Sequence, residues 1–190
     1  MVREVALRLV VPPSDEPISL EDAKAHLRVE HNEEDSQIQA WITSARMASE
    51  NDTKRIYVTQ TWELILNDLS VGRLIKIPPP ASPLQEILSI KVGGIEESLE
   101  NFAIDIFNAQ IVPKAGYALP KSNSPVSSIV VTFKAGFGEP ESVPAPLKSA
   151  ILLRVGHLYL HREAVGASNL SEVPMAVKHL ELPYRDVRVI

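Results

Sequence analysis

Two histidines four residues apart, His157 and His161, have the spacing in this chain that most resembles a catalytic metal site. Residues four apart share one face of a helix, so both imidazoles could bind one zinc ion, as in the HExxH motif. The glutamate of that motif is missing, because Leu158 stands where the general base would be. His179 and Glu163 are possible third ligands that no spacing requires. A metal-dependent hydrolase using His157 and His161 is kept as the alternative to a packed helix or a subunit contact.

Other residues with chemical potential favour structural roles. Neither Gly93-Gly94 nor Gly136-Phe137-Gly138 is followed by the Lys-Ser or Lys-Thr of a phosphate-binding loop, so hairpin turns and a strand exit explain them better. No Gly-x-Ser-x-Gly elbow presents a serine nucleophile. The paired acids Glu96 and Glu97 belong to a turn-like, solvated segment. The sequence therefore predicts a protein that is not an enzyme and holds no cofactor or metal.

Composition narrows the class of protein further. The chain has 190 residues, a formal net charge of -5 and no cysteine, which excludes thiolate chemistry and disulfides. Wrapping nucleic acid needs clustered Lys and Arg, and no such cluster occurs. The N-terminus lacks the apolar block of a signal peptide, and no apolar run reaches membrane-spanning length. We expect a soluble protein made in the cytoplasm.

Helix signals appear near both ends of the chain. Residues 2–11 predict an extended arm or edge strand, and Ser19 with Asp22 has the spacing of a capping box that begins a first helix. A second helix follows an acidic run and reaches about Ser49. The best-defined helix is expected over 145–165, with Pro146 in its first turn, Gly166 after it, and apolar residues on one face at Leu147, Ile151, Val155 and Leu158.

The middle of the chain changes to a period of two from Tyr57 onward, which is typical of strands. Further strands are predicted at 74–77, 87–92, 102–106, 110–112 and 127–134. A last short helix is expected from Pro174 to just before Pro183. The fold class is α+β: a small helical core of about four helices with an inserted antiparallel β region. The predicted boundaries are one connector domain over 1–190, a β-rich insertion over 57–135, and an extended tail over 184–190.

The order of these segments resembles that of head-tail connector (adaptor) proteins of long-tailed double-stranded DNA bacteriophages and gene transfer agents. The matching pieces are residues 17–29, the acidic start of the second helix, Thr59-Gln60-Thr61-Trp62, Val143-Pro144-Ala145-Pro146-Leu147 with the long helix, and Leu182-Pro183-Tyr184-Arg185. Nearly the whole chain is covered in order. The departure is at 93–125, which is rich in turns and weakly patterned.

Several expectations follow from the resemblance. It implies a structural virion protein that forms a ring, usually twelvefold, which joins the portal protein to a tail-proximal connector or stopper protein and lines part of the DNA channel. It implies a location in the particle neck, after assembly in the bacterial cytoplasm. DNA would pass through without sequence-specific binding, and no membrane is involved. An adaptor that works outside any virion is a further alternative.

An acidic lumen suits this role, because a ring of acidic subunits repels phosphate instead of retaining it. The candidate lumen-facing residues are Glu30, Glu33, Glu34 and Asp35. The competing interpretation is that these acids only stabilise the positive end of the second helix.

The C-terminal tail is predicted to bind the portal or a neighbouring subunit. Its residues are Tyr184, Arg185, Asp186, Val187, Arg188, Val189 and Ile190. Val187 and Val189 alternate with charged residues after the helix-ending Pro183, a pattern that suits strand addition to another chain's sheet edge. The alternative is an edge strand on the chain's own β insertion.

Overall fold

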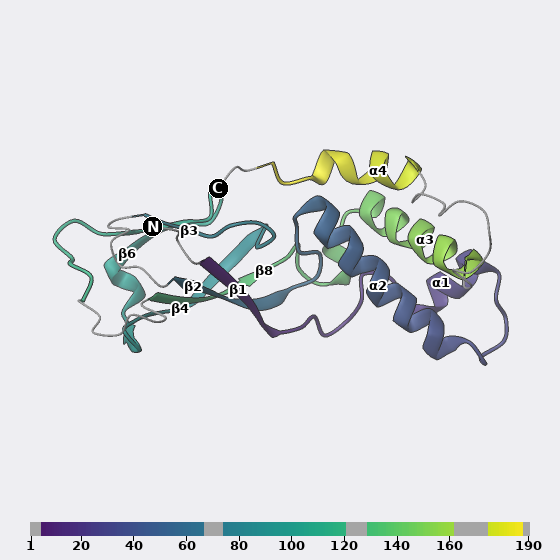
Figure 1. The fold of residues 1–190 in the computed structure, drawn as a ribbon, viewed down its shortest axis with the longest axis horizontal. Helices are drawn as coiled ribbons and strands as arrows, with labels where there is room; N and C mark the ends of the chain where they lie inside the picture. Colours follow the sequence, from purple (N-terminus) through teal and green to yellow (C-terminus); the bar gives the residue numbers. More distant parts are fainter. Residues whose placement is uncertain (1–4, 67–73, 121–128, 162–174, 188–190) are drawn as a thin grey trace.

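Helices and strands separate along the longest axis of the molecule (Figure 1). The computed structural model describes residues 5–66, 74–120, 129–161 and 175–187. In these residues, four α-helices pack at one end and two antiparallel sheets lie at the other. The predicted α+β fold, with helices from both ends of the chain around a β region, is confirmed.

The first two helices begin where local signals place them. Helix α1 (Leu20–Leu27) is capped by Ser19, whose hydroxyl accepts from the backbone of Asp22 while the Asp22 carboxylate accepts in return, so the predicted capping box is confirmed. Helix α2 (Asp35–Thr53) continues past the predicted end at Ser49. Its buried face includes Ser49 and Thr53, and the Thr53 hydroxyl donates to the Ser49 carbonyl at 2.7 Å. An apolar pattern cannot reveal this last turn, because its buried residues are polar.

Helices α3 (Ala145–Leu160) and α4 (Met175–Glu181) complete the helical end. Pro146 lies in the first turn of α3, as predicted, but the helix ends at Leu160 instead of running to 165. The rest of that prediction, including Gly166, and the expected start of α4 at Pro174 lie outside the described residues. Helices α1, α2 and α3 pack on one another, and their shared core includes Ala23, Ile38, Ile42, Ala45, Leu147, Ile151 and Val155. Short 3-10 helices are η1 (Leu99–Asn101), η2 (Pro140–Ser142) and η3 (Leu182–Tyr184).

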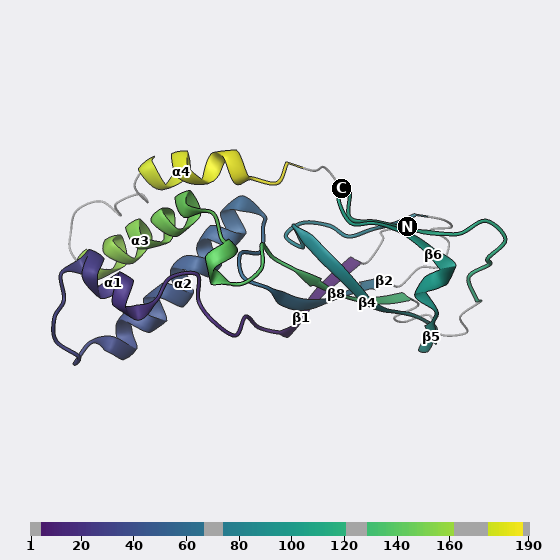
Figure 2. The same ribbon diagram turned by 180° about the vertical axis from the view of Figure 1, so that it is seen from behind.

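The larger sheet has five antiparallel strands in the order β1-β2-β8-β4-β5. Their bounds are β1 (Val5–Val11), β2 (Gln60–Leu66), β4 (Leu84–Val92), β5 (Ile95–Glu97) and β8 (Ile129–Ala135). Strand β1 lies toward the viewer in Figure 1, whereas β4 and β5 lie toward the viewer in Figure 2. The N-terminal segment is therefore the edge strand that the sequence predicted, and it joins a sheet whose other strands come from the middle of the chain.

Strand β2 begins later than predicted. Tyr57 and Val58 are buried with the helical core instead of continuing the sheet, and Val58 forms only an isolated bridge to Gly138. The alternation of these residues is typical of a strand, but here they form the connection between the helical end and the sheet.

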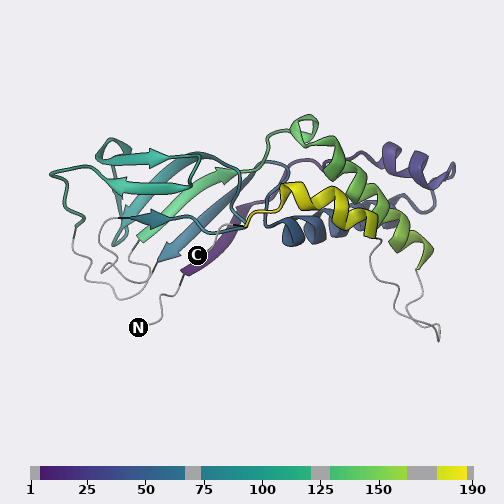
Figure 3. The same ribbon diagram turned by 90° about the horizontal axis from the view of Figure 1, so that it is seen from above.

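A smaller sheet covers part of the larger one. It consists of β3 (Ile75–Lys76), β7 (Gln110–Pro113) and β6 (Phe102–Asp105), in that order, as seen from above in Figure 3. Both sheets contribute to one core, in which Ile75, Phe102 and Ile111 join Leu64, Ile90, Val131 and Phe133. Figure 3 also places β6 and β1 on opposite sides of the β region.

Strand β5 was missed by the sequence pattern. Glu96 and Glu97 were expected in a solvated turn, but the turn is confined to Gly93 and Gly94, which have φ of 59° and 85°. Residues 95–97 then pair with the end of β4 as a hairpin. Glu96 remains exposed in this edge strand, whereas Glu97 is partly buried and accepts from the Tyr117 hydroxyl at 2.6 Å.

In the part of the chain that the structure describes, no helix combines the length and the apolar character needed to cross a bilayer.

Candidate interaction surfaces

Helix α4 is attached to the helical core by a buried ion pair. The Arg154 guanidinium of α3 lies 2.9 Å from the nearer carboxylate oxygen of Glu181 in α4, and both side chains are almost completely buried. The same guanidinium also donates to the half-exposed carboxylate of Asp52 in α2, at 2.5 Å. This pair fixes the direction in which the chain leaves α4. Sequence reasoning missed it, because the partners come from three distant helices.

The first residues of the predicted tail contact their own subunit. Arg55 donates through Nε to the Tyr184 carbonyl at 2.5 Å, and through Nη1 to Ser82 Oγ at 3.2 Å. The backbone N–H of Asp186 donates to the Thr53 carbonyl at 2.7 Å. Tyr184 ends η3 and the backbone becomes extended at Arg185, while residues 184–186 lie against the end of α2.

Beyond this attachment, Val187 is the one tail residue that the structure describes. Val187 is 80% exposed, and Arg188, Val189 and Ile190 lie outside the described residues. The partner-binding role of the tail stays a prediction; among its described residues Arg185 and Val187 are exposed, and Asp186 is buried.

A second buried network joins the helical end to the sheet. Glu50 of α2 accepts from Arg46 at 2.7 Å, from the backbone N–H of Tyr57 at 2.9 Å and from the Gln60 side chain at 3.1 Å. Arg46 also donates to Glu16, ahead of α1, at 2.7 Å. Burial raises the pKa of Glu50, although its donors act in the opposite direction. One carboxylate thus holds the chain where it leaves α2 and enters β2.

The four acidic residues proposed to face a lumen gather at the turn between α1 and α2, at the far end of the helical part (Figure 1). Asp35 pairs with Lys24 at 2.7 Å, and Glu34 accepts from the Tyr159 hydroxyl at 3.1 Å. Glu30 and Glu33 are exposed, and Glu33 lies 2.7 Å from His31. Asp35 belongs to the first turn of α2, while Glu34 occupies the N-cap without a side-chain capping bond. Glu34 and Asp35 are therefore partly buried and bonded to α3 and α1, whereas Glu30 and Glu33 are exposed.

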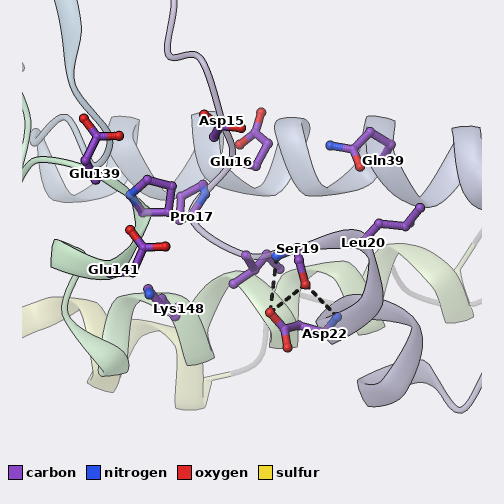
Figure 4. A pocket seen from close by; sticks show the side chains of 12 residues that line it. Asp15, Glu16, Pro17, Ser19, Leu20, Asp22, Gln39, Glu139, Glu141 and Lys148 are labelled. Carbon is purple, nitrogen blue, oxygen red and sulfur yellow. Dashed lines mark hydrogen bonds between the residues drawn. The ribbon is translucent and has the colours of Figure 1, made fainter.

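A second acidic surface was not anticipated. A hollow of about 520 Å³ lies between the start of α1, η2 and the first turns of α3 (Figure 4). Its ionisable lining residues are Asp15, Glu16, Asp22, Glu139, Glu141 and Lys148. The two acidic segments are more than a hundred residues apart in the chain, so no local spacing signals their proximity.

The histidine pair does not assemble a metal site in the described structure. The rings of His157 and His161 lie 4.4 Å apart, and Nδ1 of His161 is 2.9 Å from the His157 carbonyl oxygen. Across the four described ranges, no group of three histidine, cysteine, aspartate or glutamate side chains is placed to hold a metal ion. His179, on α4, is not brought into such a group, and Glu163 lies outside the described residues.

Comparison with solved structures shows where this architecture recurs. A chain from the neck of an empty gene transfer agent (GTA) particle, computed with C6 symmetry, matches with a TM-score of 0.76, 21% identity and 97% of each chain covered. A chain from the neck of a native GTA particle, computed with C12 symmetry, matches with a TM-score of 0.74 at 21% identity and the same coverage. A chain from the virion of a native GTA particle gives a TM-score of 0.75 at 20% identity. These similarities establish a shared fold.

Sequence comparison identifies the family. A search of curated protein sequences gives no match. The family model described as phage gp6-like head-tail connector protein matches residues 17–186, which include all four helices and every described strand except β1. The chain therefore belongs to the phage gp6-like head-tail connector protein family.

Proposed function

We propose that the protein forms a ring in the neck of a phage or GTA particle, where it joins the portal to the tail-proximal proteins and surrounds the passing DNA. The observation that carries this proposal is the family match over residues 17–186. The fold shared over 97% of each chain with a neck computed with C12 symmetry supports a ring of identical subunits, and twelve is the copy number we propose. In this proposal residues 1–190 act as one connector domain with 57–135 as its β insertion, assembled in the bacterial cytoplasm.

The role itself is tested by removing the gene from the producing cell and examining the particles by electron microscopy. We expect DNA-filled heads without attached tails, and recovery of complete particles when the gene is restored. Purified protein should also form closed rings in native mass spectrometry. Normal tailed particles from the deletion strain would overturn the proposal.

The tail is the proposed contact with the portal or a neighbouring subunit. Residues 184–186 bind their own subunit. A deletion that starts at Val187 therefore tests partner binding and keeps these contacts. We expect deletion of 187–190 to leave the melting temperature nearly unchanged and to abolish incorporation into particles. Deletion of 184–190 should in addition lower the melting temperature. Full incorporation of the shorter deletion variant would contradict the assignment of the tail.

The acidic turn between α1 and α2 is the proposed lumen surface. Of its four acids, Glu30 and Glu33 are the exposed pair, so they are the residues to reverse. A ring carrying Glu30→Lys and Glu33→Lys should retain DNA in a gel-shift assay, with an affinity that falls as salt rises. The matched control is Glu139→Lys with Glu141→Lys, which makes the same charge change in the hollow. Equal DNA retention by both variants would contradict a lumen role specific to the turn.

A further inference from the structure

An uncovered apolar strip follows the outer edge of the larger sheet. Strand β1 pairs only with β2 among the described strands. Its exposed aliphatic residues, called the β1 strip, are Val5, Leu9, Val10 and Val11, with exposures of 42, 44, 45 and 52%. Natural edge strands are usually shielded by charges, but the only charged residue in β1 is Arg8, which is paired with Glu63. The strip is therefore a surface suited to a partner.

A second apolar feature projects from the smaller sheet. Phe107, in the turn between β6 and β7, is 92% exposed, and its neighbour Ile106 is 39% exposed. A phenylalanine left almost wholly in water is the largest single apolar contact that this surface offers to another molecule.

The turn that carries Phe107 is held in one conformation. The Asp105 carboxylate accepts from the backbone N–H of Asn108 at 2.9 Å and from the Asn108 side chain at 2.7 Å. These bonds lower the pKa of Asp105. Ala109 closes the turn with φ of 51° and donates to the Ile106 carbonyl. Because the turn is ordered before any contact, docking Phe107 loses little conformational entropy.

The two features lie on opposite broad sides of the molecule. Strand β1 is toward the viewer in Figure 1, and β6 lies on the side shown in Figure 2; the view in Figure 3 places them at opposite margins. A closed ring needs head-to-tail contacts, in which each subunit offers two different patches on opposite sides. An isologous dimer would instead need one patch that complements itself.

We propose that, in the ring, Phe107 of one subunit packs on the β1 strip of the next subunit. The inference rests on the ring proposed above and names the contact that closes it. The contact is apolar in character, since Arg8 already pairs with Glu63 and the Asp105 carboxylate already accepts from Asn108. Its support is the placement of two exposed apolar features on opposite sides of one subunit (Figure 3), as successive subunits of a ring require. Contact between an aromatic anchor and aliphatic side chains removes apolar surface of both subunits from water.

Crosslinking tests the contact directly, since the chain has no cysteine to interfere. The variant with Leu9→Cys and Phe107→Cys is treated with a short bis-maleimide and analysed on a denaturing gel. We expect a ladder of dimers, trimers and larger species, because each subunit then links to a neighbour on both sides. The control pair is Leu160→Cys with Phe107→Cys; Leu160 is 78% exposed at the far end of α3 and should give no ladder.

Mixing two defective variants tests the head-to-tail geometry. Phe107→Asp removes the anchor, and Leu9→Lys with Val10→Lys disrupts the strip. The association constant of each variant alone should be lower than that of wild type by a factor of roughly ten or more. Mixed together, they retain one intact contact and should form one-to-one dimers that grow no further. Unchanged melting temperatures verify the fold, since all three side chains are exposed by two-fifths or more.

The outcomes separate this inference from the ring itself. Rings seen by native mass spectrometry without the specific ladder would overturn the Phe107 contact and leave the ring standing. Links formed by the Phe107→Cys single variant would indicate an isologous contact and also overturn it. A protein that stays monomeric at every concentration and gives no ladder would count against both.

Discussion

Arg154 and Glu181 form a buried ion pair between α3 and α4, with side chains only 8 and 6% exposed. A buried pair adds little net attraction, but removing one partner is costly because the other charge stays buried. Here, among the described residues, only the half-exposed Asp52 would remain as a partner for Arg154. The position of the pair matters for assembly, since α4 leads directly into η3 and the C-terminal tail.

Replacing Glu181 with Ala should lower the free energy of unfolding by about 3 to 5 kcal/mol, since the Arg154 guanidinium then loses its buried partner. Urea denaturation measures this change. The matched variant is Asp52→Ala, which removes the other acid on the same guanidinium. The Asp52 side chain is 56% exposed, so solvent screening limits its contribution to about 1 kcal/mol or less. Equal losses from the two variants would contradict the dominance of the buried partner.

Ile151 tests whether α3 is the centre of the helical core. The residue is completely buried among side chains of α1, α2 and α3, so Ile151→Ala should cost about 2 to 5 kcal/mol through lost transfer energy and an unfilled cavity. Leu160→Ala on the same helix is the control, with a change of about 0.5 kcal/mol or less, because that side chain is 78% exposed. A denaturation midpoint unchanged by Ile151→Ala would show that α3 is not central to the core.

Glu50 should make stability depend on pH in a defined direction. Burial raises its pKa in the folded state, so folding favours the protonated carboxyl. The contribution of this residue is therefore present below the unfolded pKa, near 4.5, and is lost as pH rises through the raised folded value. Relative to Glu50→Gln, the wild-type protein should gain stability as pH falls from neutral.

Denaturant titrations of both proteins at a series of pH values measure this difference. The exposed substitution Glu33→Gln controls for the loss of one negative charge. If the difference between wild type and Glu50→Gln stays constant with pH, the carboxyl does not exchange its proton on folding and the proposed coupling is wrong.

Local chemistry accounts for the parts of this fold that the sequence predicted correctly. Ser19 and Asp22 are three residues apart, so their capping bonds are visible in the sequence itself, and Pro146 signals the first turn of α3 in the same way. Alternating residues predicted most of the strands for the same reason, because burial on one face of a sheet leaves a period of two.

The interactions that were missed connect residues far apart in the chain. Arg154 and Asp52 are separated by 102 residues, and only the packing of helices brings them together. The acidic hollow likewise depends on η2 lying beside the start of α1. The contact of Tyr184 with its own subunit was not predicted, because it joins a backbone carbonyl to Arg55, which is 129 residues away.

Gly136 should be the least replaceable described glycine. Its φ is 133°, and an added Cβ would lie 2.8 Å from the Val58 carbonyl atoms and 2.9 Å from the Thr59 nitrogen. These neighbours are backbone atoms at the connection between the helical end and the sheet, so they cannot move aside as a flexible side chain can.

Gly136→Ala therefore combines an unfavourable φ with a steric clash, and we expect it to destabilise the protein by more than about 3 kcal/mol. Gly94→Ala is the matched control, since its φ of 85° is also left-handed but nothing lies within 4 Å of the added Cβ. That variant should cost only about 1 to 2 kcal/mol, from the backbone conformation alone. Thermal and urea denaturation of both variants give the comparison. Similar losses at the two positions would mean that the backbone conformation dominates, and that the Val58 contact relaxes at little cost.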